Sequence, residues 1–176
     1  MLRVFALIPV VTMAVTLPAA AQQKVNLPTE GKYDVTSCGV STMTAIEFSE
    51  TRSAANWESL GTNRSAEPGG FLDMTSFRCV GSGATLDGKT WSGVNYCQAV
   101  DKDGDKTLAK FAFEGPKVTG EMLGGTGKYE GMVRTIASET LGAFPAAKPA
   151  TFNYCNRVSG TYKLKSEATG TSTPSK

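Results

Sequence analysis

The stretch TFNYCNRVSGTYKLK, residues 151–165, carries the clearest structural signal in the chain. Apolar side chains take even positions, at Phe152, Tyr154, Val158, Tyr162 and Leu164, and most odd positions are polar. Successive side chains of a β-strand point to opposite faces, so this period of two predicts a strand with one buried and one wet face. Gly160 interrupts the apolar face and marks a candidate bend.

Shorter runs rich in Thr, Val, Phe, Tyr and Trp precede this strand, separated by Gly, Asn and Asp. They predict strands at 33–46, 55–62, 72–80, 90–100, 109–114, 118–122 and 131–139. Residues 90–100 mix polar and apolar side chains on both faces, and a small barrel with a cavity requires such a half-polar inward face. We therefore expect an all-β fold, a single eight-stranded antiparallel barrel. A two-sheet sandwich would satisfy the same pattern.

The chain begins with features of a secretory signal at residues 1–21. Arg3 precedes a mostly apolar run, and Pro18 is followed by Ala19, Ala20 and Ala21, a small-residue cleavage site. The apolar run is shorter than the roughly 20 residues that span a bilayer, which disfavours the alternative of a retained anchor. We expect an exported protein, periplasmic or secreted, without membrane insertion. Residues 22–32 are expected to form an exposed lead-in, 33–165 the barrel domain and 166–176 a disordered tail.

Four cysteines form an even set, which in an oxidising compartment indicates disulfides. Asp87-Gly88 is a hairpin turn signal, and pairing around it places position 79 opposite 96 or 97. This favours a Cys79–Cys97 bond and leaves Cys38 for Cys155. The alternative is four buried free thiols.

Composition excludes several classes of chemistry. The chain has no histidine, so Ser-His-Asp and Cys-His nucleophile systems and His-ligated metals are excluded. A formal net charge of +2 lacks the basic excess of a nucleic-acid binder. We expect no cofactor, no metal site and no nucleic-acid partner.

The segment Gly124-Gly-Thr-Gly-Lys-Tyr-Glu-Gly131 resembles the G-G-T-G-x-[F/Y]-x-G segment of the allene oxide cyclase and dirigent barrels, and that of bacterial exported proteins of unassigned role that share the barrel. The resemblance implies a lipocalin-like eight-stranded barrel with a hydrophobic cavity open at one end. It also implies either ring closure of a fatty-acid epoxide or orientation of phenoxy radicals, and assembly into dimers or trimers. The spacing of a phosphate-binding loop is absent, and we expect these glycines to shape a turn.

The segment Asp101-Lys-Asp-Gly-Asp-Lys-Thr107 places three carboxylates at alternate positions, as at the start of a calcium loop. Lys106 stands where such a loop needs Gly, and Ala112 where it needs a bidentate Glu. We favour an exposed hairpin turn around Asp103-Gly104, with a looser oxygen-ligand cation site as the alternative.

The aromatic residues of the strands and of the glycine-rich segment are the candidate ligand-binding set: Trp57, Trp91, Tyr96, Phe111, Phe113 and Tyr129. Glu47, Asp73 and Glu114 are candidate cavity carboxylates, although Glu114 follows the polar positions of its strand. We expect a small-molecule binder that holds an apolar or aromatic ligand. The alternatives are an isomerase or cyclase that orients a reactive substrate in the same cavity, and an envelope interaction scaffold.

Overall fold

The computed structural model describes residues 27–165, so the expected signal peptide, the first part of the lead-in and the expected tail lie outside the described residues. Within them the chain is all-β, with one short 3-10 turn, η1 (Gly127–Tyr129), and no α-helix. The strands are β1 (Glu30–Ser49), β2 (Arg52–Ser65), β3 (Thr75–Thr85), β4 (Trp91–Val100), β5 (Lys106–Glu114), β6 (Lys117–Gly125), β7 (Val133–Arg134), β8 (Ala137–Phe144) and β9 (Thr151–Lys163).

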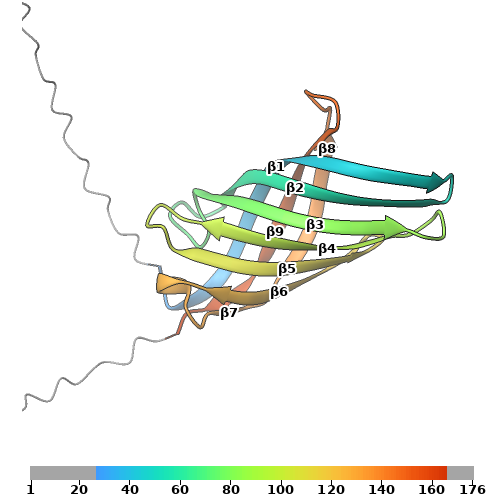
Figure 1. Cartoon of the computed structure of the whole chain (residues 1–176). Coiled ribbons are helices and arrows are strands. Elements are labelled where there is room, and N and C mark those ends of the chain that lie inside the picture. Colours follow the sequence, from blue (N-terminus) through green and yellow to red (C-terminus); the bar gives the residue numbers. More distant parts are fainter. Residues whose placement is uncertain (1–26, 166–176) are drawn as a thin grey trace, which may run out of the picture.

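All strands belong to one antiparallel sheet that curls into a barrel wall (Figure 1). The order of paired strands is β6-β5-β4-β3-β2-β1-β9, and β7 and β8 both pair with β9 as two parts of one interrupted edge. Counted in this way, the wall has the eight strands that the sequence predicts. β6 shares no backbone ladder with β8 in the described chain; a Cβ on Gly120 would clash with Ile136, so the side chain of Ile136 lies against β6 at this seam.

Side chains alternate across the wall, as the period of two requires. Along β2 the inward positions are Ala55, Trp57, Ser59, Gly61 and Asn63, whereas the intervening residues are exposed. On β9, Val158 and Tyr162 are buried on the predicted apolar face. The predicted strand and its facing are therefore confirmed.

The base of the barrel is closed by five buried residues, Tyr33, Phe71, Tyr129, Met132 and Tyr162, which we call the base cluster. Phe71 lies at its centre: its ring stacks on Tyr162 with centroids 4.6 Å apart and meets Tyr33 edge-on at 5.1 Å. Phe71 comes from the segment between β2 and β3. Hydrogen bonds from Asn63 to Thr75 (2.8 Å) and from Thr75 to the carbonyl of Leu72 (3.0 Å) fix that segment.

Both predicted disulfides are present, and the described chain holds no free cysteine. Cys79 and Cys97 face each other on β3 and β4, and Cys38 faces Cys155 across β1 and β9. Cys79 is buried among the inward residues of β3, whereas Cys38 alternates with the inward Ser37 and lies on the outer side. One bond therefore staples the inside of the wall and the other the outside.

Most strands extend beyond their predicted bounds, and three differences have a clear structural cause. β1 begins at Glu30, because residues 30–32 of the expected lead-in already pair with Thr161–Lys163 of β9. β3 begins at Thr75, because Leu72 and Met74 have positive φ and belong to the turn that carries Phe71. The predicted strand at 131–139 is broken after Arg134 and resumes at Ala137.

Candidate functional site

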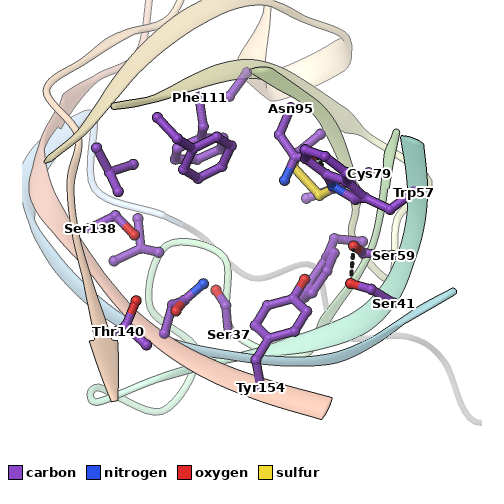
Figure 2. Close-up of a pocket in the computed structure, with 18 of the residues that line it drawn as sticks. Ser37, Ser41, Trp57, Ser59, Cys79, Asn95, Phe111, Ser138, Thr140 and Tyr154 are labelled. Atoms are coloured by element: carbon purple, nitrogen blue, oxygen red, sulfur yellow. Dashed lines mark hydrogen bonds between the residues drawn. A yellow bond between two sulfur atoms is a disulfide. The ribbon is translucent and has the colours of Figure 1, made fainter. Parts of the chain in front are cut away.

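The barrel encloses a cavity of about 540 Å³, within the range of small-molecule sites. Figure 2 shows its lining side chains pointing inward around an open centre. Aromatic residues contribute much of the wall: Trp57, Phe77, Trp91, Phe111, Phe113, Phe152 and Tyr154. Polar side chains interrupt it: Ser37, Ser41, Ser59, Asn63, Asn95, Thr107, Ser138, Thr140 and Asn156.

The cavity has one closed and one open end. The loops after β2 and β6 place Phe71, Leu72, Tyr129 and Met132 in buried positions, and these close the base. The hairpin tips at the other end bury no comparable residue: Ile46, Phe48 and Leu86 are more than 70% exposed there. A ligand would therefore enter the cavity at this end, past the tips of the β1–β2 and β3–β4 hairpins.

Four of the six predicted ligand-binding aromatics line the cavity: Trp57, Trp91, Phe111 and Phe113. The two tryptophans of the chain lie close together, with ring centroids 6.2 Å apart. Tyr96 does not line the cavity, because it alternates with Asn95 and Cys97 and is 43% exposed on the outer side. Tyr129 belongs to the base cluster, where burial and then the charge of Asp101 raise its pKa.

Polar contacts organise two parts of the wall. Trp57 donates a hydrogen bond from Nε1 to Oδ1 of Asn95 (2.6 Å), which fixes its indole against β4. Next to Trp57, on the same side of the cavity, the hydroxyls of Ser41 and Ser59 lie 2.6 Å apart beside Tyr154 (Figure 2). Burial raises the pKa of Tyr154, and hydrogen bonds with Ser59 and Ser41 only partly oppose this effect, so the phenol is neutral at pH 7.

Among residues 27–165, Arg134 is the only charged residue that lines the cavity. Its guanidinium lies at the base, with Cζ 5.8 Å from the Phe71 ring centroid and 5.9 Å from that of Tyr33. Nε and Nη1 are buried and have no hydrogen-bond partner within residues 27–165. Burial lowers the pKa of Arg134, an effect that Tyr33 partly opposes, yet an arginine stays protonated at neutral pH.

The candidate carboxylates lie elsewhere. Glu47 and Glu114 are exposed to solvent, the latter as its strand position predicts. Asp73 accepts hydrogen bonds from the backbone N–H groups of Ser65 (3.1 Å) and Gly69 (2.8 Å), and so stabilises the β2–β3 turn. No carboxylate lines the described cavity.

Arg134, Tyr154 and the Ser41–Ser59 pair are cavity residues that sequence reasoning did not single out. A signal for Arg134 exists in the alternation of residues 131–139: Met132 is buried and Ile136 packs against the core, on the same parity as Arg134. A charge between two apolar residues on one face of a strand predicts either a bend or an inward cation. The sequence around the two serines does not indicate that they face inward, because a single Ser is equally suited to the solvent-exposed face of a strand.

The aspartate-rich segment 101–107 and the glycine-rich segment 124–131 meet at the base of the barrel. Asp103-Gly104 forms the predicted turn between β4 and β5, and Gly104 has a φ of 84°. Lys128, from the glycine-rich segment, places Nζ within 3.1 Å of carboxylate oxygens of Asp101, Asp103 and Asp105. Lys128 thus supplies the cation for these carboxylates.

The glycines of that segment shape a turn, as predicted. Gly127 and Gly131 have positive φ, and a Cβ on Gly127 would clash with the carboxylate of Asp105. Desolvation lowers the pKa of Lys128, but its hydrogen bonds with the three aspartates outweigh this and raise the pKa above the ordinary value. The segment therefore joins two loops rather than lining the cavity.

Comparison with known protein families, with curated proteins and with solved structures finds no match. Among the described residues, no cluster of His, Cys, Asp and Glu is suited to hold a metal ion. In the same part of the chain, no helix has the length and apolar character needed to cross a bilayer.

Proposed function

We propose that this protein is exported and binds a small apolar or aromatic molecule in the barrel cavity. The observation that carries the proposal is the cavity itself: about 540 Å³ of space with an aromatic wall, a closed base and an open end. Such a site buries most of an apolar ligand, and the few polar groups orient it. The two disulfides support an oxidising compartment, in line with the signal-like residues 1–21.

The chemistry of the lining favours binding over acid–base catalysis. Its titratable side chains are Tyr154, whose pKa is raised, and Arg134, which stays protonated. Neither can accept a proton from a substrate at neutral pH. The cavity is suited to hold a molecule, and release it, unchanged.

We also propose kinship with the allene oxide cyclase and dirigent barrels. The support is the glycine-rich segment 124–131, which forms a tight turn at the base of an eight-stranded antiparallel wall. This kinship favours one second candidate function, an isomerase or cyclase that orients a reactive substrate. Tyr154, beside Ser41 and Ser59, is the group that would contact such a substrate.

Titration with the neutral fluorescent probe N-phenyl-1-naphthylamine tests the binding proposal. Ser138 and Thr140 of β8 line the cavity (Figure 2), whereas Glu139 between them is exposed. We expect saturable binding with one probe per chain, at least tenfold weaker in Ser138→Phe and Thr140→Phe and unchanged in Glu139→Phe. Binding that the space-filling variants leave unchanged, or no binding, would overturn the proposal. A change in product stereochemistry on adding protein to a reactive epoxide would instead support the cyclase.

A further inference from the structure

Arg134 holds a positive charge that the fold does not neutralise. It forms no ion pair in the described chain, and two of its three guanidinium nitrogens are buried without a hydrogen-bond partner. An unpaired charge in an apolar site is costly, because the protein replaces only part of the hydration that the charge loses. Most such groups in proteins are paired or bind a ligand.

The groups around Arg134 are either occupied or uncharged. The hydroxyl of Tyr33 donates to the backbone carbonyl of Thr135 (2.7 Å), and burial raises its pKa, so this group is both occupied and uncharged. Glu30, which lies with Arg134 along a shallow hollow outside the base, pairs with Lys163 at 3.4 Å. The rings of Tyr33 and Phe71 offer cation–π attraction, but they accept no strong hydrogen bond.

The two ends of the cavity differ in character, because the positive charge lies at one of them. Arg134 lies at the closed base, and the aromatic side chains of Trp57, Trp91 and Phe113 lie toward the open end. A molecule with an anionic head and an apolar body matches this order, with its head at Arg134 and its body along the aromatic wall. A carboxylate is the anion that a guanidinium binds with good geometry, through charge-assisted hydrogen bonds.

We infer that the cavity is selective for an amphiphile with a carboxylate head, such as a fatty acid or an aromatic acid, bound head-first against Arg134. This inference rests on the proposed binding function and narrows it to one ligand class. Because no carboxylate lines the described cavity, nothing there repels such a head group. A cationic amphiphile of the same length is disfavoured by the same charge.

The test compares four probes with one twelve-carbon chain: dodecanoate, 1-dodecanol, dodecylamine and dodecyl phosphate. Both tryptophans line the cavity, so their fluorescence reports occupancy without a label. We expect dodecanoate to bind at least tenfold more tightly than dodecanol, and dodecylamine to bind most weakly. Tighter binding of dodecyl phosphate than of dodecanoate would overturn the carboxylate assignment.

Arg134→Met removes the charge and keeps an extended apolar side chain, and Arg134→Gln is the second variant. Arg78→Met is the matched control, because Arg78 pairs with Glu58 on the exposed outer face. We expect both Arg134 variants to lose the tenfold preference for dodecanoate while their affinity for dodecanol is unchanged, and Arg78→Met to behave as wild type. Circular dichroism and thermal unfolding establish that each variant is folded, and we expect Arg134→Met to be at least as stable as wild type.

The outcomes separate this inference from the proposed function. Equal binding of dodecanoate and dodecanol to the wild-type protein, or equal weakening of both by Arg134→Met, overturns the role of Arg134 and leaves the apolar binding site intact. Absence of binding by all four probes and by the neutral naphthylamine overturns both.

Discussion

Nζ of Lys128 lies 2.7 Å from Oδ2 of Asp101, and this pair joins the β4–β5 turn to the glycine-rich turn after β6. The same oxygen of Asp101 accepts a hydrogen bond from the hydroxyl of Tyr129 (3.0 Å). The charged pair and a member of the base cluster are therefore linked, and the closed end of the barrel depends on a polar contact at its surface.

Replacement of Lys128 by Met should destabilise the protein, because Asp101, Asp103 and Asp105 then lose the cation that they share, although Lys102 still contacts Asp103 at 3.1 Å. Asp101 and Lys128 are largely but not fully buried, so we expect a loss between those of exposed and buried pairs, about 1–3 kcal/mol. Urea denaturation measures the loss, which should shrink at 1 M salt because salt screens the repulsion. Lys117→Met, at an exposed lysine without an ion pair in the described chain, is the control; equal stability of the two variants would contradict the prediction.

The stability should also depend on pH through Asp34. Hydrogen bonds from Arg157, a neighbour across β1 and β9, hold the pKa of Asp34 below its ordinary value. The folded state therefore binds the proton less readily than the unfolded state, and the stabilisation is present above about pH 5 and is lost as the pH falls through the lowered pKa. We expect the stability difference between wild type and Asp34→Asn to be constant from pH 7 to about pH 5 and to shrink as the pH falls further, through the lowered pKa.

Chemical denaturation across this pH range measures that difference. Glu114→Gln, at an exposed carboxylate without an ion pair in the described chain, serves as control and should show no such change. A difference that grows as the pH falls would show that the sign of the argument is wrong.

The sequence predicts the strands, their facing and both disulfides because these follow from local alternation and from one turn. Asp87-Gly88 places Cys79 opposite Cys97, and once that pair is assigned the remaining pairing is determined. The facing of β9 follows from its aromatic and aliphatic residues, which share one parity.

The composition of the cavity wall could not be predicted in the same way. Ser41 and Ser59 are buried, whereas Val40 and Leu60, which pair with each other on the outer face, are more than 40% exposed. At these positions polar side chains face the cavity and apolar side chains face outward, which reverses the usual pattern, so hydropathy assigns these residues to the wrong sides. The facing of Tyr96 could not be predicted for a similar reason, because an aromatic residue on a strand suits either face.

The two disulfides should differ in their contributions to stability and to binding. Cys38–Cys155 closes a loop of 117 residues and Cys79–Cys97 one of 18, which in the chain-entropy treatment correspond to about 5 and about 3 kcal/mol. We therefore expect replacement of the outer pair by alanine to lower the free energy of unfolding more than replacement of the inner pair. Only the inner pair lines the cavity, so only its replacement should change the affinity for the naphthylamine probe. A change in probe affinity confined to the outer variant would contradict this assignment.

Phe71 should be the largest single contributor to the closed end. It is the largest fully buried side chain of the described chain, 2% exposed, and its ring contacts those of Tyr33, Tyr129 and Tyr162. Replacement by alanine leaves a void that rings on three different segments cannot refill without moving, so we expect a loss of about 3–5 kcal/mol. Phe48→Ala is the matched control, because Phe48 is 79% exposed at the open end and its replacement should change stability by less than about 0.5 kcal/mol. Urea denaturation distinguishes the two, and similar losses would show that the base cluster does not hold the barrel closed.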